Sequence, residues 1–174
     1  MMLFPRIGKF IIIFVAIAFI VAGIRGYQLY QYVFRENVKT EFVLYIHPGD
    51  SFEQLTENLK LNGVLISLKA FQWVSKKKEF SQSVKTGRYL LKKGMNTNQI
   101  VNTLKGGLQT PLNVTFNNIR TKEDLAGKVS KYLIADSLSI LNLFDDENQI
   151  EEFGFGAETY RAMFIPNTYQ FYWT

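Results

Sequence analysis

The chain has 174 residues, a formal net charge of +5 at pH 7, no cysteine and one histidine. These counts exclude a disulfide framework and a thiolate metal site, and any zinc site or Ser-His-Asp triad would depend on a single imidazole. Roughly 150 residues follow an apolar N-terminal segment, enough for one domain or two small ones with a hydrophobic core.

The segment Phe10–Ile24 is an unbroken apolar run between Lys9 and Arg25. At ~1.5 Å per residue it covers roughly 23 Å, less than the ~30 Å hydrocarbon core, but both flanking cations can snorkel and the tyrosines that follow suit the headgroup zone. We therefore expect a membrane anchor over residues 10–26. A cleaved signal peptide is the alternative, because its apolar region has a similar length. The basic residues on the two sides of the run are too evenly divided to fix its orientation.

Charge is unevenly distributed beyond this segment. Fourteen lysines and arginines and three acids lie within residues 60–131, whereas seven acids and no base lie within residues 136–158. A basic middle can face an anionic membrane surface or an anionic cell-wall polymer, although solvated helix faces account for any single cluster. No groove-reading motif is present, so we expect no nucleic-acid partner. His47 stands at a predicted strand end, where we expect a solvated side chain.

A weak internal repeat organises the folded part of the chain. Each copy is a short strand, a short connection, a capping residue and a helix with apolar residues four apart. Those apolar pairs are Leu55 and Leu59, Ile100 and Leu104, and Leu125 and Val129.

The elements follow from local pattern. Alternation predicts a strand over 42–46, and Ser51 with Gln54 then caps a helix that Gly63 ends. We expect a second helix around 68–74, a strand over 87–91, a helix that ends at Gly106, a strand over 112–116, and a helix from Thr121 to about Leu133. Residues 136–160 are expected to be helical with acidic turns. The order β-α-α-β-α-β-α predicts an α+β fold.

The chain stops at Thr174, shortly after the apolar residues 164–166. We expect this ending to leave a strand or turn without partners, and we interpret the sequence as one part of a longer reading frame.

Several short motifs, in this order and spacing, resemble the bacterial MltG (YceG-like) family of endolytic murein transglycosylases. The matching stretches are Ile46–Ser51 with Leu55 and Leu59, Gly87–Tyr89, Lys93–Met95, Ile100–Gly107, Val114–Phe116 and Phe164–Tyr169. The resemblance implies a cytoplasmic tail (1–9), a transmembrane anchor (10–26), a linker (27–40), a LysM-like subdomain (41–110) and the beginning of a catalytic domain (111–174).

The resemblance also implies an activity. Family members cleave bonds between N-acetylmuramic acid and N-acetylglucosamine in nascent glycan strands and leave 1,6-anhydro ends. It implies a single-pass protein of the cytoplasmic (inner) membrane with its N-terminus in the cytoplasm and its domain outside. The expected partners are peptidoglycan strands, the membrane and peptidoglycan synthases. We expect no metal and no other cofactor.

The family's catalytic Glu lies five residues before the Pro of a Glu-Gly-x-x-x-Pro-(Asp/Asn)-Thr-Tyr motif. Counting back from Pro166 gives Arg161, which cannot act as a general acid. The nearest carboxylate that can substitute is Glu158, with Arg161 to orient it. The alternatives are that Glu158 is an exposed glutamate at a helix end, that the acid lies beyond Thr174, or that the chain belongs to a family branch without lytic activity.

The aromatic stretch around this motif suggests a substrate site. We assign substrate binding to Asn167, Tyr169, Gln170 and Trp173, since rings can stack on sugars and amides can bond hydroxyl or acetamido groups. Core packing is the alternative for the rings, and we expect it for Phe164 and Phe171. A non-catalytic, membrane-tethered glycan-binding or scaffolding protein is the alternative function, and an exported domain without a glycan role is a third interpretation.

Overall fold

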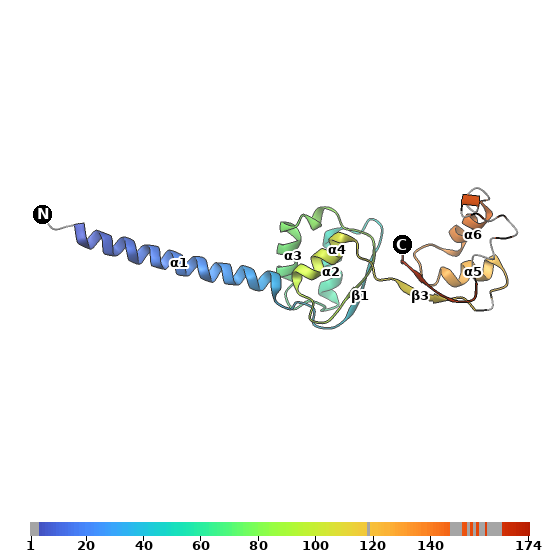
Figure 1. Ribbon diagram of the computed structural model, residues 1–174, viewed down its shortest axis with the longest axis horizontal. Helices are drawn as coiled ribbons and strands as arrows, with labels where there is room; N and C mark the ends of the chain where they lie inside the picture. Colours follow the sequence, from blue (N-terminus) through green and yellow to red (C-terminus); the bar gives the residue numbers. More distant parts are fainter. Residues whose placement is uncertain are drawn as a thin grey trace. The chain divides into compact units, whose positions relative to one another are not determined.

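A computed structural model describes residues 4–117, 119–146, 151–152, 154, 156, 159 and 165–174, with side chains from Phe10 onward. Its elements, in chain order (Figure 1), are α1 (Phe4–Phe34), β1 (Phe42–Ile46), α2 (Phe52–Leu61), α3 (Leu68–Lys77), the 3-10 helix η1 (Phe80–Gln82), β2 (Gly87–Leu91), α4 (Thr97–Gly106), β3 (Leu112–Thr115), α5 (Lys122–Val129), α6 (Ser137–Asp145) and β4 (Thr168–Phe171). This content confirms the predicted α+β class.

Two compact units make up the chain. The first unit is Met1–Glu41, Phe52–Ser83 and Lys92–Asn102, and the second unit is Phe42–Ser51, Val84–Leu91 and Thr103–Thr174. The domain boundaries expected from the sequence stay predictions.

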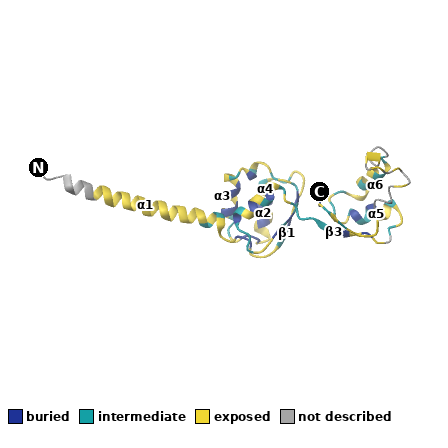
Figure 2. Ribbon diagram, viewed as in Figure 1, coloured by how far each residue is buried: buried dark blue, intermediate teal, exposed yellow. Residues whose placement is uncertain are grey.

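Helix α1 is long and apolar enough to cross a membrane. Its candidate span, Phe10–Phe34, has 25 residues and a mean hydropathy of 2.4, and all of its side chains except Gln31 and Val33 are exposed (Figure 2). The helix continues into residues 27–40, where we expected a linker. At ~1.5 Å per residue the span covers roughly 37 Å, which is longer than the ~30 Å hydrocarbon core. The apolar run Phe10–Ile24 alone is shorter than that core.

The first unit packs its helices around aromatic rings. Phe52 stacks on Phe71 with ring centroids 5.9 Å apart and meets Phe80 edge-on at 6.0 Å. Helix α2 ends at Leu61, and the predicted terminator Gly63 follows it with a φ of 59°, in the left-handed region that favours glycine. The buried apolar side chains of this unit are Val38, Leu55, Leu59, Val64, Leu65, Ala70, Phe71, Val74, Phe80, Ile100 and Val101.

Asn37 joins three segments of the first unit. Its side chain is 2% exposed. The Asn37 amide donates to the Ser67 carbonyl at 3.0 Å and to the Thr97 hydroxyl at 3.1 Å, and its Oδ1 accepts the Ser67 N–H at 2.6 Å. Ser67 in turn caps α3 by accepting the Ala70 N–H. One buried amide therefore fixes the exit from α1 against the starts of α3 and α4.

The second unit contains two antiparallel strand pairs. β1 pairs with β2, from Phe42 opposite Leu91 to Ile46 opposite Gly87. β3 pairs with β4, which gives the C-terminal segment the partner that we expected it to lack. That expectation was wrong because β4 lies far from β3 in sequence, and local pattern says nothing about pairing at that distance.

The repeat seen in the sequence is confirmed. Strands β1, β2 and β3 lead by short connections into α2, α4 and α5, and all six apolar residues of the repeat are buried. Thr121 caps α5 by accepting the Asp124 N–H at 3.1 Å. Helix α5 ends at Val129, four residues before the predicted end. The chain turns there so that the Ile134 N–H can donate to the Trp173 carbonyl at 2.8 Å, a tertiary contact that overrides helical propensity.

We expect Asn37→Ala to lower the free energy of unfolding by about 1–3 kcal/mol, because the Ser67 N–H loses its buried acceptor. Thermal unfolding of the full chain in detergent, followed by circular dichroism, measures this. The control Asn58→Ala removes an exposed amide on α2 and should change stability by less than about 0.5 kcal/mol. Equal losses in the two variants would contradict the role assigned to Asn37.

The cap of α6 should depend on pH. The Asp136 carboxylate accepts the Ser139 N–H at 2.7 Å, and this hydrogen bond holds the pKa of Asp136 below its ordinary value of 3.8. Because the folded pKa is lowered, the cap stabilises the fold above the ordinary value and loses this effect as the pH falls through the folded pKa. We expect the Asp136 carboxyl carbon to titrate below 3.8 by NMR, and Asp136→Asn to cap without this pH dependence. A midpoint at or above 3.8 would count against the bond.

Candidate functional site

The catalytic candidates lie outside the described residues. Glu158, Arg161 and Phe164 belong to the part of the chain for which the structure gives no placement, so the role assigned to Glu158 stays a prediction. The four residues predicted to bind substrate are described, and they all lie on or beside β4.

The two-stranded antiparallel sheet of β3 and β4 has one apolar face and one polar face. Its register places Leu112 opposite Phe171 and Val114 opposite Tyr169. These four side chains pack on the core of the second unit with Phe116, Leu125 and Val129. The alternate side chains therefore project to the opposite face of this sheet.

That opposite face consists of Asn113, Thr115, Thr168 and Gln170, which we call the polar β3–β4 face. All four side chains are exposed. Asn113 lies opposite Gln170, and the Thr115 and Thr168 hydroxyls are 2.8 Å apart. The face offers two carboxamides and two hydroxyls, which donate to and accept from neutral polar ligands such as sugars. Neither strand contributes a carboxylate.

Sequence reasoning found Gln170 but missed Asn113 and Thr115. The signal was present in Leu112-Asn113-Val114-Thr115, where apolar and polar residues alternate as on a half-buried strand. We used that alternation to predict the strand. The partner of the strand, and so the company of Gln170, required the register.

Asn167 is exposed and holds the turn into β4. Its Oδ1 accepts the Thr168 N–H at 2.7 Å, and its backbone carbonyl accepts the Phe116 N–H at 2.8 Å. One face of its side chain is therefore used within the protein, and the rest is open to solvent.

Tyr169 lies on the core side of the β3–β4 sheet. Its ring centroid is 5.2 Å from that of Phe116, and its hydroxyl donates to the Ile165 carbonyl at 2.9 Å. Phe171 packs on the same core, as predicted. The ring of Tyr169 is half-buried, so a stacking role for it depends on its outer edge and stays a prediction.

Trp173 is 8% exposed, far less than Asn167 or Gln170. Its ring meets Tyr45 and His47 edge-on, with centroids 5.1 Å away in each case. Next to it, the Gln109 amide donates to the Thr174 hydroxyl at 2.8 Å. Trp173 thus anchors the C-terminal segment, and its role in substrate binding stays a prediction.

His47 is solvated as predicted, with 60% of its side chain exposed. Its Nδ1 lies 3.6 Å from Asp50 Oδ2, and that oxygen also accepts the His47 backbone N–H. Within the described ranges, no group of three or more His, Asp or Glu side chains is placed to hold a metal ion.

Comparison with known proteins identifies the family. The YceG-like family model matches residues 44–174, and a comparison with curated proteins gives no match. A solved structure of a yceG-like protein from Listeria monocytogenes is similar with a TM-score of 0.36 and 19% identity, over 75% of this chain and 48% of that one. The chain thus spans about half the length of that protein, and so low a TM-score supports no conclusion. Because the family match covers most of its length, this chain belongs to the YceG-like family, which corresponds to the MltG family that its motifs resemble.

Proposed function

We propose that this protein is a membrane-anchored endolytic peptidoglycan transglycosylase. It cleaves bonds between N-acetylmuramic acid and N-acetylglucosamine in nascent strands, leaves 1,6-anhydro ends and so terminates glycan polymerisation. The observation that carries the proposal is the family match over residues 44–174. The polar β3–β4 face supports the proposal, because its amides and hydroxyls can form hydrogen bonds with the hydroxyl and acetamido groups of sugars.

The reaction requires a single carboxylic acid. The acid protonates the glycosidic oxygen as its bond to C1 breaks, and the sugar's own 6-hydroxyl attacks C1. The carboxylate then takes the hydroxyl proton, which regenerates the acid and closes the anhydro ring without water. This differs from glycoside hydrolases, which use two carboxylates. We assign the acid to Glu158 and the positioning of the glycan to Asn167 and Gln170.

We further propose that α1 is an uncleaved anchor in the cytoplasmic membrane, with the N-terminus inside and the domain that follows α1 outside. The exposed, apolar span Phe10–Phe34 supports membrane attachment. Nascent glycan strands are made at that surface, so peptidoglycan synthases are the proposed partners.

A non-catalytic, membrane-tethered peptidoglycan-binding or scaffolding protein is the second candidate. The observation that favours it is Arg161, which stands where the family motif has its acid. A guanidinium stays protonated and cannot deliver a proton to a glycosidic oxygen. This candidate function uses the polar β3–β4 face as a binding surface and needs no acid.

We expect the full chain to release anhydro-muramyl ends from purified murein, and Glu158→Gln to abolish this release. Mass spectrometry of the soluble fragments measures it. Glu152→Gln, which neutralises an exposed acid in the same stretch, is the control and should retain activity. Binding of wild-type protein to murein without anhydro ends would instead favour the scaffolding function.

We expect Asn113→Ala with Gln170→Ala to weaken binding to murein sacculi at least fivefold, because two hydrogen bonds of about 0.5–1.5 kcal/mol each are lost. The melting temperature should be unchanged, since both side chains are exposed. A sedimentation assay measures binding, with Asn142→Ala on the exposed surface of α6 as the control. Unaltered binding of the double variant would show that the polar β3–β4 face does not bind murein.

A further inference from the structure

The depth of α1 in a bilayer follows from its apolar run, which is centred on Ile17. A hydrocarbon core ~30 Å thick extends about ten residues to either side of that centre and therefore ends near Tyr27. The headgroup layer adds roughly 5–7 Å, which brings its outer limit to about Tyr32. This step rests on the proposed anchoring of α1.

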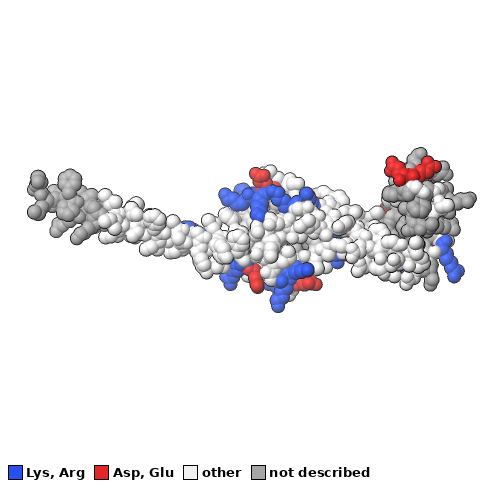
Figure 3. Space-filling model, in the orientation of Figure 1, with Lys and Arg blue, Asp and Glu red and all other residues white. Residues whose placement is uncertain are grey.

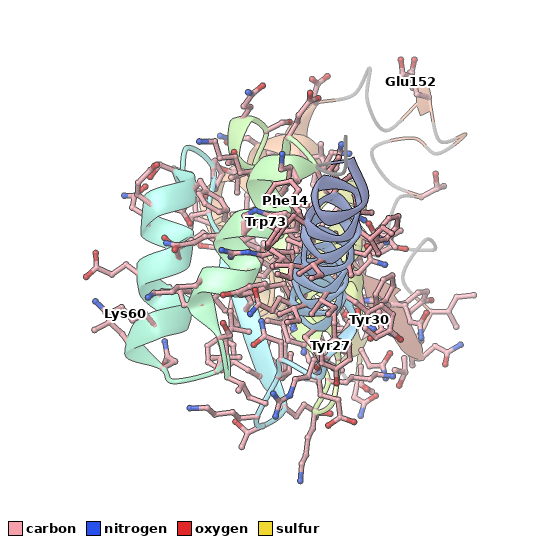
Figure 4. All side chains as sticks on the ribbon, turned by 90° about the vertical axis from the view of Figure 1, so that its left-hand side faces the viewer. Phe14, Tyr27, Tyr30, Lys60, Trp73 and Glu152 are labelled. Carbon is pink, nitrogen blue, oxygen red and sulfur yellow. The ribbon has the colours of Figure 1, made fainter. Side chains whose placement is uncertain are left out.

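Helix α3 lies at that same depth. The Trp73 ring centroid is 6.4 Å from that of Tyr32, and Lys77 Nζ is 6.0 Å from the Trp73 ring. Figure 4, which looks along α1 from its N-terminal end, shows Trp73 close beside α1 and Lys60 of α2 directed away from it. Trp73 and Lys77 are therefore within reach of the headgroups.

One exposed face of α3 combines lysines with this tryptophan. Lys69, Trp73, Lys76 and Lys77 follow helical spacing and are all exposed, and we call them the basic–aromatic face. The opposite side of the helix, with Ala70, Phe71 and Val74, is buried in the first unit. Helix α3 contains no acid, and basic side chains gather over this part of the molecule in Figure 3.

A cavity of about 390 Å³ adjoins the face, between the last turns of α1 and the start of α3. Tyr27 and Gln31 line it from α1, Arg35 from just beyond the end of α1, and Ile66 and Ser67 from the other side. Glu36 also lines it and balances the charge of Arg35, so the attraction for anions comes from the lysines of α3. The cavity opens at the depth of the headgroups and offers polar groups beside an apolar wall.

We propose that the basic–aromatic face and this cavity form a docking surface for the anionic phospholipid headgroups of the bilayer that α1 spans. Tryptophan prefers the membrane interface, and each lysine near an anionic surface strengthens attachment roughly fivefold. Docking holds the part of the first unit that follows α1 against the membrane, so α1 acts as one of two attachments. The surface is continuous with the membrane helix, and its charge complements acidic lipids.

The absence of cysteine allows a single-site probe on the full chain. A fluorophore at Gln72→Cys, exposed on α3, reports on the docking surface, and the same fluorophore at Asn58→Cys on α2 is the control. Each protein is reconstituted in nanodiscs that contain headgroup spin-labelled lipid. Phosphatidylcholine alone is compared with a mixture that includes phosphatidylglycerol, and co-elution with the nanodiscs verifies that α1 has inserted.

We expect strong quenching at position 72 and weak quenching at position 58. Phosphatidylglycerol should increase the quenching at position 72. Lys76→Gln with Lys77→Gln should remove that increase, whereas Lys60→Gln should not. The proposal would be overturned by equal quenching at both positions, or by an increase with phosphatidylglycerol that persists in the double variant. It would also be overturned if added murein, and not lipid, occupied the surface and reduced the quenching at position 72. Insertion without docking leaves the anchor intact, and release of anhydro ends from murein is measured separately, so each failure is distinguishable.

Discussion

The pairing of β3 with β4 is the constraint on which the second unit depends. It joins segments that lie 53 residues apart, at Thr115 and Thr168, and closing a loop of that length has an entropic cost that the buried faces of both strands must offset. Val114, Tyr169 and Phe171 supply the apolar contact. The same register decides what remains outside, because a slip of β4 by one residue would bury Thr168 and Gln170 and expose the rings of Tyr169 and Phe171. Core and candidate binding face are therefore two sides of one pairing.

The first unit obeys a different constraint, which is set where the chain leaves α1. The Asn37 side chain donates to the Ser67 carbonyl and accepts the Ser67 N–H, and so links this exit to the start of α3. If α1 crosses a bilayer, the height of α3 above it is then determined by helix geometry alone. The lysines and the tryptophan of α3 fall at the headgroup level without any further adjustment. The link through Asn37 therefore lets the proposed anchoring of α1 set the position of α3 relative to the bilayer.

Local elements could be predicted from the sequence, whereas long-range contacts could not. The strand over 42–46, the glycine that ends α2 and the Thr121 cap depend on neighbouring residues, and each is confirmed. The end of α5 and the partner of β4 depend on contacts across the unit, and both were wrong. The site divides in the same way. The amide of Gln170 predicted a role in substrate binding, but only the register brought Asn113 beside it, and only tertiary packing placed Trp173 among Tyr45 and His47.

The choice between enzyme and binding protein depends on one electrostatic conflict. A general acid needs a pKa raised towards the working pH, which burial in an apolar setting provides. Arg161 follows Glu158 by three residues, and a guanidinium close to a carboxylate lowers its pKa. An Arg161 that contacts Glu158 therefore opposes the role that it is invoked to support, unless desolvation outweighs the ion pair or Arg161 binds the glycan instead. A neutral glycan needs no charged side chain for binding, and the polar β3–β4 face has none. Binding is thus compatible with the residues as they stand, whereas catalysis requires Glu158 to be buried and separated from its neighbouring cation.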